Sequence, residues 1–344
     1  MRAVTFQAPG EVRVEERPDP VLGEPGDAIV AVEATGVCGS DLHIYHGRIA
    51  IEQGFTIGHE YVGAVLEKGD AVSRVEVGDR VLGAFQVACG ECFFCLRGAY
   101  HRCEQGRTFG HGATLGNLQG AQAERLLVPH AGLALRRVPE GMAADVALFA
   151  GDVMGTAYHA VVAAGLQPGE SVAVLGLGPV GLCAVQVARA AGAAHVIAVD
   201  TVEERLAMAR AFGATAVHLT EGDPRAAARE ATDGRGVDVA VDAVGDPRAL
   251  ELAVRLARSA GRVSVIGVYA ERQEVHMGLV WIKGLTLHTG QANVLAHLDP
   301  VLAMLDAGVL DPAPLVTRHM ALDDAPEAYA AYARREALKI VLTP

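Results

Sequence analysis

The sequence predicts an α/β protein of two domains, one with a doubly wound parallel sheet and one that is mostly β. Its 344 residues exceed the usual size of a single domain. Short β-type runs separated by turn residues fill the first part of the chain. From about Pro168, apolar strands alternate with helical segments, which indicates a parallel sheet covered by helices on both faces.

Four strands are expected in the N-terminal part, because each run is rich in β-branched residues and ends at a turn. They are RAVTF from Arg2, DAIVAVEATG from Asp27, EYVGAVLEKG from Glu60 and DRVLGAF from Asp79. This irregular spacing is typical of a mostly β domain.

The second part repeats strand and helix in order. The expected elements are the strand SVAVLG, a helix over 179–191, the strand HVIAVD, the helix VEERLAMARAFG, the strand VDVAVDAVG, the helix PRALELAVRLARSAG, and the strands RVSVIGV and LTLHTG. After about Gln291 a helical segment, VLAHLDPVLAMLDAG, precedes a last helix and the strand LKIVL. The uncharged run over 171–188 is long enough to span a membrane, but its glycines and Pro179 indicate a strand, a turn and a helix instead.

The hydrophobic content and the acidic net charge limit the kinds of partner that the protein can bind. The chain is 51% hydrophobic with a formal net charge of −12, so we expect a packed protein that binds neither nucleic acid nor an anionic membrane. The first residues contain no apolar segment of the secretory type, so a cytoplasmic protein with small-molecule partners is expected.

A glycine-rich turn opens the second part of the chain. Gly176-Leu-Gly178-Pro179-Val180-Gly181 follows an apolar strand and begins a helix, which is the context of a Rossmann-type dinucleotide site. The helix N-terminus offers free N–H groups to a pyrophosphate. Asp200 ends the next strand, where a carboxylate can accept ribose hydroxyls and repel a 2′-phosphate. NAD is therefore favoured over NADP, unless Asp200 only caps a helix.

Four cysteines lie close together, and their spacing indicates a metal site. The four thiolates can close a tetrahedron around Zn²⁺ and leave no open position, so this zinc would be structural. An iron–sulfur cluster and a DNA-contacting zinc ribbon are the alternatives, but the spacing and the acidic charge disfavour them. The residues are Cys89, Cys92, Cys95 and Cys103.

Two further segments and one isolated charge suggest a reactive site. GVCGSDLHIYHG carries a cysteine, a serine and a histidine, and IGHEYVGAV carries a His-Glu pair. Between Asp145 and Glu170 the only fully charged side chain is that of Asp152, in an apolar stretch where a carboxylate needs a partner. The candidates are Cys38, Ser40, His43, His59, Glu60 and Asp152.

These motifs occur in the order found in zinc-dependent medium-chain alcohol dehydrogenases, which the chain resembles over essentially its whole length. The resemblance implies a GroES-like catalytic domain over 1–153 and 292–344, with the four-cysteine lobe at about 88–104. It implies an NAD-binding Rossmann domain over 154–291. It also suggests a homotetramer and two zinc ions per chain, one catalytic and one structural.

Residue by residue, the resemblance implies a catalytic zinc held by Cys38, His59 and Asp152, with Glu60 approaching the metal when another ligand leaves. Many members have a cysteine in place of Asp152, but some bacterial secondary-alcohol and formaldehyde dehydrogenases have an aspartate there. Oxygen is an acceptable zinc ligand, so the site remains consistent.

The resemblance also implies a proton path in which Ser40 takes the hydroxyl proton of the zinc-bound alcohol, which becomes an alkoxide, and His43 relays that proton to solvent. Three residues resemble contacts to the cofactor: Thr156 beside the nicotinamide, Lys339 near the pyrophosphate and Arg205 along the adenine. Each of these three could instead be a surface or helix residue.

The activity so implied is the reversible oxidation of primary and secondary alcohols to aldehydes and ketones by hydride transfer to NAD. A polyol or diol dehydrogenase is the alternative, because CGSDLHIYHGRI also resembles that group. A formaldehyde dehydrogenase with tightly held cofactor ranks below both. The sequence does not decide which alcohol is the substrate.

Overall fold

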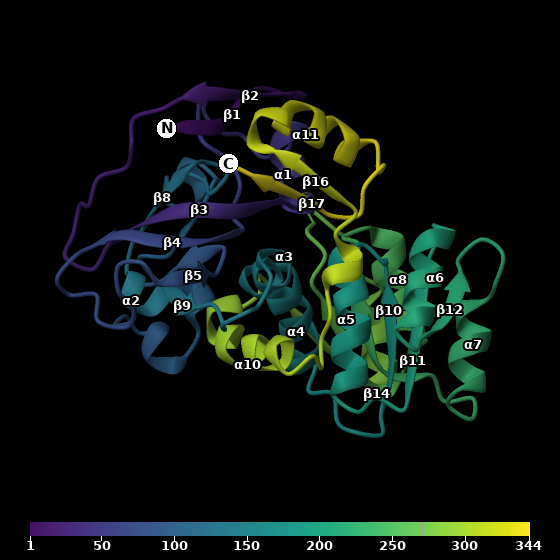
Figure 1. The fold of residues 1–344 in the computed structure, drawn as a ribbon. Coiled ribbons are helices and arrows are strands. Elements are labelled where there is room, and N and C mark those ends of the chain that lie inside the picture. The colour runs from purple at the N-terminus through teal and green to yellow at the C-terminus, as the bar shows by residue number, and fades with distance from the viewer. Residues whose placement is uncertain (270–271) are drawn as a thin grey trace. The chain divides into compact units, whose positions relative to one another are not determined.

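The computed structural model describes residues 1–269 and 272–344, which form two compact units (Figure 1). Unit 1 comprises Met1–Gly155 and Asn293–Pro344, and unit 2 comprises Thr156–Ala292. Unit 2 is thus an insertion in the chain of unit 1.

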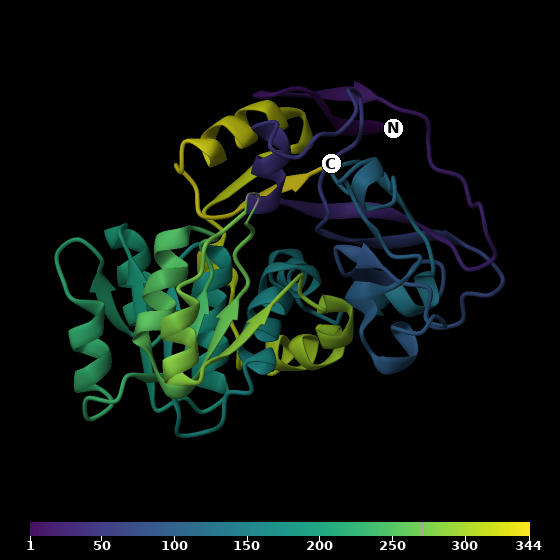
Figure 2. The ribbon, with the colours of Figure 1, turned by 180° about the vertical axis from the view of Figure 1, so that it is seen from behind.

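Unit 2 is a six-stranded parallel sheet in the order β12-β11-β10-β13-β14-β15. Helices flank both faces of this sheet (Figure 2), and the strands β10, β11 and β13 are almost wholly buried because both faces are covered. The elements are β10 (Ser171–Leu175), α5 (Pro179–Ala190), β11 (His195–Asp200), α6 (Glu203–Ala211), β12 (Thr215–His218), α7 (Pro224–Glu230), β13 (Val237–Asp242), α8 (Pro247–Leu256), β14 (Ala257–Val265), α9 (Met277–Lys283) and β15 (Thr286–Thr289). The predicted doubly wound α/β fold is confirmed, and so is the strand, turn and helix reading of 171–188.

Two details of unit 2 differ from the prediction. The helix after Pro247 ends at Leu256, and the residues predicted to continue it belong to β14. The pairing of β13 with β14 shifts in register between Val237 and Val239, which accommodates these extra residues. Strand β14 therefore begins at Ala257, before the apolar segment that was predicted as the strand. The short elements β12, α7 and α9 were not predicted, because segments of four to seven residues are too short to show a clear period.

Unit 1 is mostly β, as expected, and contains a seven-stranded sheet in the order β16-β17-β3-β4-β5-β9, with β8 paired to β3. Its strands are β1 (Arg2–Ala8), β2 (Glu11–Glu16), β3 (Ala28–Val37), β4 (Tyr61–Lys68), β5 (Arg80–Gly83), β6 (Gln86–Val87), β7 (Arg107–Thr108), β8 (Arg125–Val128), β9 (Leu135–Arg137), β16 (Arg318–Ala321) and β17 (Ile340–Thr343). Its helices are α1 (Gly39–Tyr45), α2 (Ala131–Ala134), α3 (Ala144–Leu148), α10 (Val294–Asp306) and α11 (Ala325–Ala333), while α4 (Val153–Ala163) crosses from unit 1 into unit 2.

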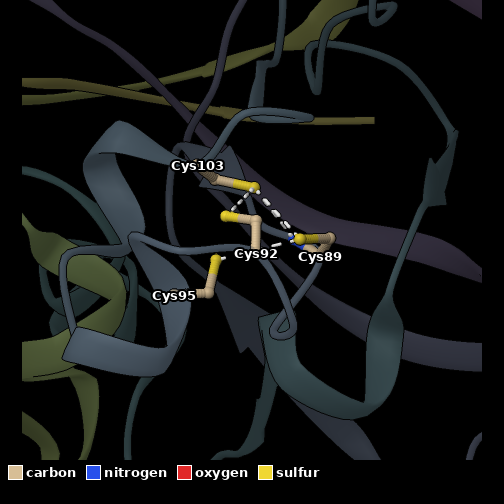
Figure 3. Close-up of side chains that lie close together, drawn as sticks. All are labelled: Cys89, Cys92, Cys95 and Cys103. Atoms are coloured by element: carbon tan, nitrogen blue, oxygen red, sulfur yellow. Dashed lines mark hydrogen bonds between the residues drawn. The ribbon is translucent and has the colours of Figure 1, made fainter.

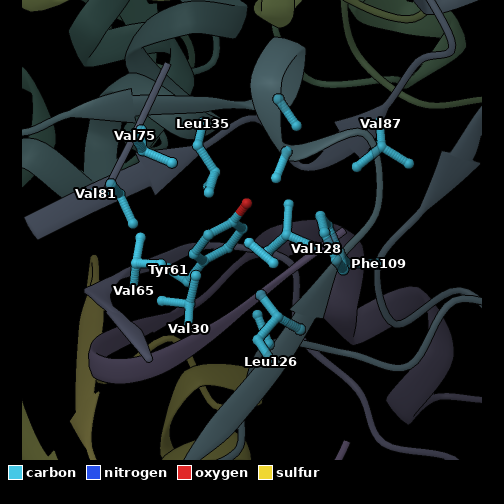
Figure 4. Packing of buried hydrophobic residues seen from close by; sticks show 14 of the residues in the cluster. Val30, Tyr61, Val65, Val75, Val81, Val87, Phe109, Leu126, Val128 and Leu135 are labelled. Atoms are coloured by element: carbon cyan, nitrogen blue, oxygen red, sulfur yellow. The ribbon is translucent and has the colours of Figure 1, made fainter. Parts of the chain in front are cut away.

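The core of unit 1 is built around Tyr61, whose ring lies among valine and leucine side chains and edge-on to Phe109 (Figure 4). The hydroxyl group of Tyr61 is buried and has no hydrogen-bond partner among the described residues. Gly83 passes so close to this hydroxyl that a Cβ atom there would overlap it. The ring is therefore fixed by packing alone.

Membrane-spanning helices were also sought in the described part of the chain. No single helix there is long and apolar enough to cross a bilayer. One pair of helices, Ala144–Gly151 and Val153–Ala163, meets the length and composition test only when taken together, and the pair is bent by 45°.

Replacing Tyr61 with Phe should leave the protein as stable or raise its free energy of unfolding by about 1 kcal/mol, because a buried unpaired hydroxyl carries a desolvation cost. Tyr329→Phe is the matched control, since the Tyr329 hydroxyl donates to Gln122 Oε1 at 2.8 Å, and it should lose about 1 kcal/mol. Urea unfolding measures both variants. A clear loss of stability in Tyr61→Phe would show that the hydroxyl has a partner.

Candidate active site

The first part of the site is the turn into helix α1. Cys38 precedes the helix in an extended conformation, and its N–H donates to Asp41 Oδ2 at 2.9 Å. Asp41 is fully buried, and its other oxygen, Oδ1, lies 3.2 Å from Nδ1 of His59. One carboxylate therefore orients both the cysteine backbone and the histidine ring.

The second part brings three potential ligands together. His59, which lies just before β4, has its Nε2 atom 3.2 Å from Oδ2 of Asp152. The same oxygen lies 3.1 Å from Cys38 Sγ. Ser40 Oγ lies 3.3 Å from His59 Nε2, so the serine hydroxyl borders the group.

Burial sets the charge of these side chains. Burial alone would raise the pKa of Asp152, but the hydrogen bond and charge of His59 lower it overall. Burial would lower the pKa of His59, yet Asp41 and Asp152 raise it well above its ordinary value. Burial and the Asp152 charge raise the pKa of the Cys38 thiol to about 11. Without a metal, the Asp152 carboxylate is therefore paired with a protonated His59 beside a neutral Cys38 thiol, and a metal ion that binds there must displace the protons of both ligands.

Glu60 is held by a buried lysine. Lys339 Nζ lies 2.5 Å from each Glu60 carboxylate oxygen and donates to the Val37 carbonyl oxygen at 3.1 Å. Burial would lower the pKa of Lys339, but Glu60 raises it overall. The pair fits against Gly36, where a Cβ atom would overlap Glu60 Oε2.

The donor set fits a zinc ion. One ligand atom from each of four residues lies within 4.8 Å of the others, and the residues are Cys38, His59, Glu60 and Asp152. Sulfur, imidazole nitrogen and carboxylate oxygen are the donors that Zn²⁺ accepts. With Glu60 paired to Lys339, three donors remain, which leaves a position for substrate in a tetrahedral site.

The four-cysteine lobe forms a second candidate metal site. The four side chains point toward one another (Figure 3), and neighbouring sulfur atoms lie 3.5 Å to 3.9 Å apart. A tetrahedral zinc with Zn–S bonds of about 2.3 Å spaces its sulfur ligands about 3.8 Å apart. The thiols are free, so the lobe matches a structural zinc and not disulfides.

The proposed proton path begins at Ser40. Ser40 and His43 lie three residues apart on helix α1, as the sequence predicts. His43 is half-buried, and burial, together with Arg48 and His46, lowers the pKa of its imidazole. A neutral imidazole at this place can both accept and donate a proton.

The glycine-rich turn of unit 2 has the geometry expected for close backbone approach. Gly176 has φ +83°, and a Cβ atom at Gly181 would overlap the Gly176 carbonyl oxygen, so helix α5 begins directly against the turn. Gly178 has open space where a side chain would project. Pro179 and Val180 form the first helical turn.

Asp200 lies at the end of β11 beside this turn. Its carboxylate accepts N–H groups of Leu177 at 2.6 Å, Thr201 at 2.7 Å and Val202 at 3.0 Å. Arg205 Nη1 is 3.8 Å from Asp200 Oδ2, so the two predicted adenosine contacts neighbour each other. A carboxylate has about four acceptor sites, which leaves about one for a ribose hydroxyl.

Three contacts were not predicted from the sequence. Asp41 lies against His59 as well as the Cys38 backbone, and its position three residues after Cys38 was the available signal. Lys339 was predicted at the pyrophosphate, but the structure places it against Glu60, and the pyrophosphate contact stays a prediction. The His111 ring lies 5.3 Å from that of His59. Thr156 lies half-buried on α4.

Family models match the chain twice. The model for the alcohol dehydrogenase GroES-like domain matches residues 24–140, and that for zinc-binding dehydrogenase matches residues 179–296. A probable zinc-binding alcohol dehydrogenase of Mycobacterium tuberculosis is 38% identical and covers 100% of this chain and 89% of that protein.

Two solved structures are similar over the whole chain. Alcohol dehydrogenase TADH from Thermus sp. ATN1 is 42% identical with a TM-score of 0.97, covering 100% of this chain and 99% of that one. The 2R,3R-butanediol dehydrogenase of Bacillus subtilis is 30% identical with a TM-score of 0.86, and the match covers 100% of this chain and 99% of that one.

The chain belongs to the zinc-binding medium-chain alcohol dehydrogenase family. It is accordingly an NAD(P)-dependent zinc alcohol dehydrogenase, an oxidoreductase that acts on CH–OH donors.

Replacing Asp152 with Asn should lower the zinc content by about one ion per chain and leave the ion of the cysteine lobe in place, because a carboxylate ligand is lost at one site only. Metal analysis of the purified protein measures the change. Asp145→Ala, which removes a nearby carboxylate outside the donor set, is the control and should keep full zinc. Full zinc in Asp152→Asn would exclude the aspartate as a ligand.

Proposed function

We propose that this dehydrogenase oxidises primary and secondary alcohols reversibly to aldehydes and ketones, with NAD as its preferred acceptor. The supporting observation is the convergence of Cys38, His59 and Asp152, with Glu60 withheld by Lys339. Zinc bound by the three donors would polarise the alcohol oxygen and lower its pKa.

The residues around this donor set have separate tasks. The Asp41 carboxylate lies 3.2 Å from Nδ1 of His59, and this charge contact favours the ring orientation in which Nε2 faces the ligand group. Ser40 Oγ lies beside that nitrogen and is placed to take the proton of the alcohol. His43, on the same face of α1, passes the proton to solvent. Loss of the proton makes hydride transfer to the nicotinamide favourable.

Ser40→Ala should lower kcat about 100-fold, since it removes a proton acceptor in the reacting step. Zinc content and the KM for NAD should stay unchanged, because Ser40 is neither in the donor set nor in the dinucleotide turn. Steady-state kinetics measure the effect. Ser73→Ala, at an exposed position, is the control. An unchanged kcat would remove Ser40 from the path.

The preference for NAD rests on Asp200. Its negative charge repels a 2′-phosphate, and its remaining acceptor site suits a ribose hydroxyl. Gly176, Gly178 and Gly181 would let the pyrophosphate approach the start of α5, where Pro179 and Val180 lie. Arg205 and Thr156 are proposed contacts to the adenine and the nicotinamide.

Asp200→Gly should reduce the ratio of NAD to NADP efficiency at least about tenfold, because the repulsion of the 2′-phosphate disappears. Initial rates with both cofactors measure the ratio. Asp200→Asn keeps an acceptor for the backbone N–H groups and guards against a folding defect. If neither variant changes the ratio, Asp200 does not select the cofactor.

A diol or polyol dehydrogenase is the second candidate. The segment CGSDLHIYHGRI, which carries Cys38, resembles that group, and the Bacillus subtilis relative is a butanediol dehydrogenase. Both candidates use the same donor set and differ only in the substrate side chain.

We also propose a cytoplasmic homotetramer. The cysteines at both candidate metal sites form no disulfides, which favours a reducing compartment. Helix α9, which precedes the edge strand β15 in the chain, exposes Met277 (59%), Trp281 (78%) and Ile282 (70%). An exposed apolar helix and an open strand edge each favour self-association.

Trp281→Glu should shift the protein from tetramer to a smaller species, because a charge is placed in the proposed contact. Light scattering after size-exclusion chromatography measures the mass. Val21→Glu is the matched control, since Val21 is equally exposed but lies in unit 1. A monomeric wild-type protein would contradict the proposal.

A further inference from the structure

A second histidine lies against the candidate metal site. The His111 and His59 rings have centroids 5.3 Å apart and planes at 61°, and only 6% of His111 is exposed. His111 is not part of the donor set. Each nitrogen atom of a buried imidazole needs a hydrogen-bond partner, so the partners of His111 indicate what this residue does.

The loop that carries His111 is shaped to bring it there. Gly110 and Gly112, on either side, have φ of +71° and +63°, a conformation that favours glycine. A Cβ atom at Gly110 would lie 2.5 Å from the carbonyl oxygen of Gly58, the residue before His59. The two backbones therefore touch, and this contact sets the distance between the histidine rings.

The hydrogen bonding of His111 defines which nitrogen is available. Its Nδ1 atom is 2.8 Å from the Phe109 carbonyl oxygen. A carbonyl oxygen only accepts, so Nδ1 carries the proton and Nε2 presents a lone pair. No described residue forms a hydrogen bond with Nε2. This atom is also not one of the fully buried polar atoms that lack a partner, so part of its surface is accessible to solvent.

A second aromatic ring, that of Phe85, also packs against His59 and serves as a comparison for His111. Phe85 meets His59 edge-on at 6.2 Å, with planes at 86°. Phe85 fills space without a polar atom, whereas His111 in a similar contact presents an acceptor. Packing alone does not require a nitrogen at position 111.

We propose that His111 determines substrate specificity by accepting a hydrogen bond from a second hydroxyl group, next to the one that is oxidised. This inference rests on the proposed function, and it names vicinal diols as the favoured substrate class. A vicinal diol whose reacting oxygen lies by Ser40 and His59 carries its other hydroxyl on the adjacent carbon, and the His111 ring, 5.3 Å from that of His59, is the neighbouring group that can accept from it. A monohydric alcohol lacks this hydrogen bond and leaves Nε2 to water, so it is disfavoured by about the value of one hydrogen bond.

The test compares 2,3-butanediol with 2-butanol, which differ by one hydroxyl, using NAD and the zinc-loaded protein. His111→Asn retains a donor for the Phe109 carbonyl but has no acceptor at the place of Nε2. His111→Gln places an amide oxygen there. The ratio of kcat/KM for the diol to that for the monohydric alcohol should fall about tenfold in His111→Asn, the value of one hydrogen bond. It should stay within about threefold of wild type in His111→Gln.

His195→Asn, at an exposed strand end in unit 2, is the control for the exchange itself and should not change the ratio. Zinc content and circular dichroism establish that each variant is folded. Equal loss on both alcohols, or an unchanged ratio in both His111 variants, would overturn the role of His111. If the wild-type protein oxidises neither alcohol nor any other, the proposed function fails instead.

Discussion

The pairing of Glu60 with Lys339 is the interaction on which the candidate active site depends. Two carboxylates, a thiol and an imidazole share a buried volume, and each isolated charge there would be costly. Among the residues that the structure describes, Lys339 supplies the permanent cation within hydrogen-bond distance of Glu60. Removing one partner of such a pair leaves an uncompensated buried charge, which is strongly destabilising.

Sheet pairing explains how these distant residues meet. Strand β3 pairs with β17 on one side, where Gly36 faces Val341, and with β4 on the other, where Thr35 faces Tyr61. Lys339 and Glu60 each lie one residue outside their strands and so arrive at the same edge. The absent side chain of Gly36 leaves the space in which they join.

Local motifs made much of the site predictable. Three motifs lie within short segments of the chain: Cys38 with Ser40, the His59-Glu60 pair, and the four-cysteine lobe. Asp152 could be predicted because it is an isolated charge in an apolar stretch. The alternation of strands and helices in unit 2 also determined its fold class, which the structure confirms. The partner of Lys339 could not be predicted, because periodicity does not give the order of strands in a sheet. The role of His111 was hidden for a similar reason, since it follows from the contact of Gly110 with Gly58.

The Glu60–Lys339 pair joins an early and a late part of the chain, so it can form only late in synthesis. The two residues are 279 positions apart, and all of unit 2 is translated between them. A nascent chain folds from its N-terminus as it emerges, so β3 and β4 appear long before β17. Until the last strand arrives, Glu60 has no counter-ion and the sheet has an open edge at β3. This site is therefore completed only after all of unit 2 has been made, and until then the carboxylate of Glu60 and the open edge of β3 belong to an incomplete sheet.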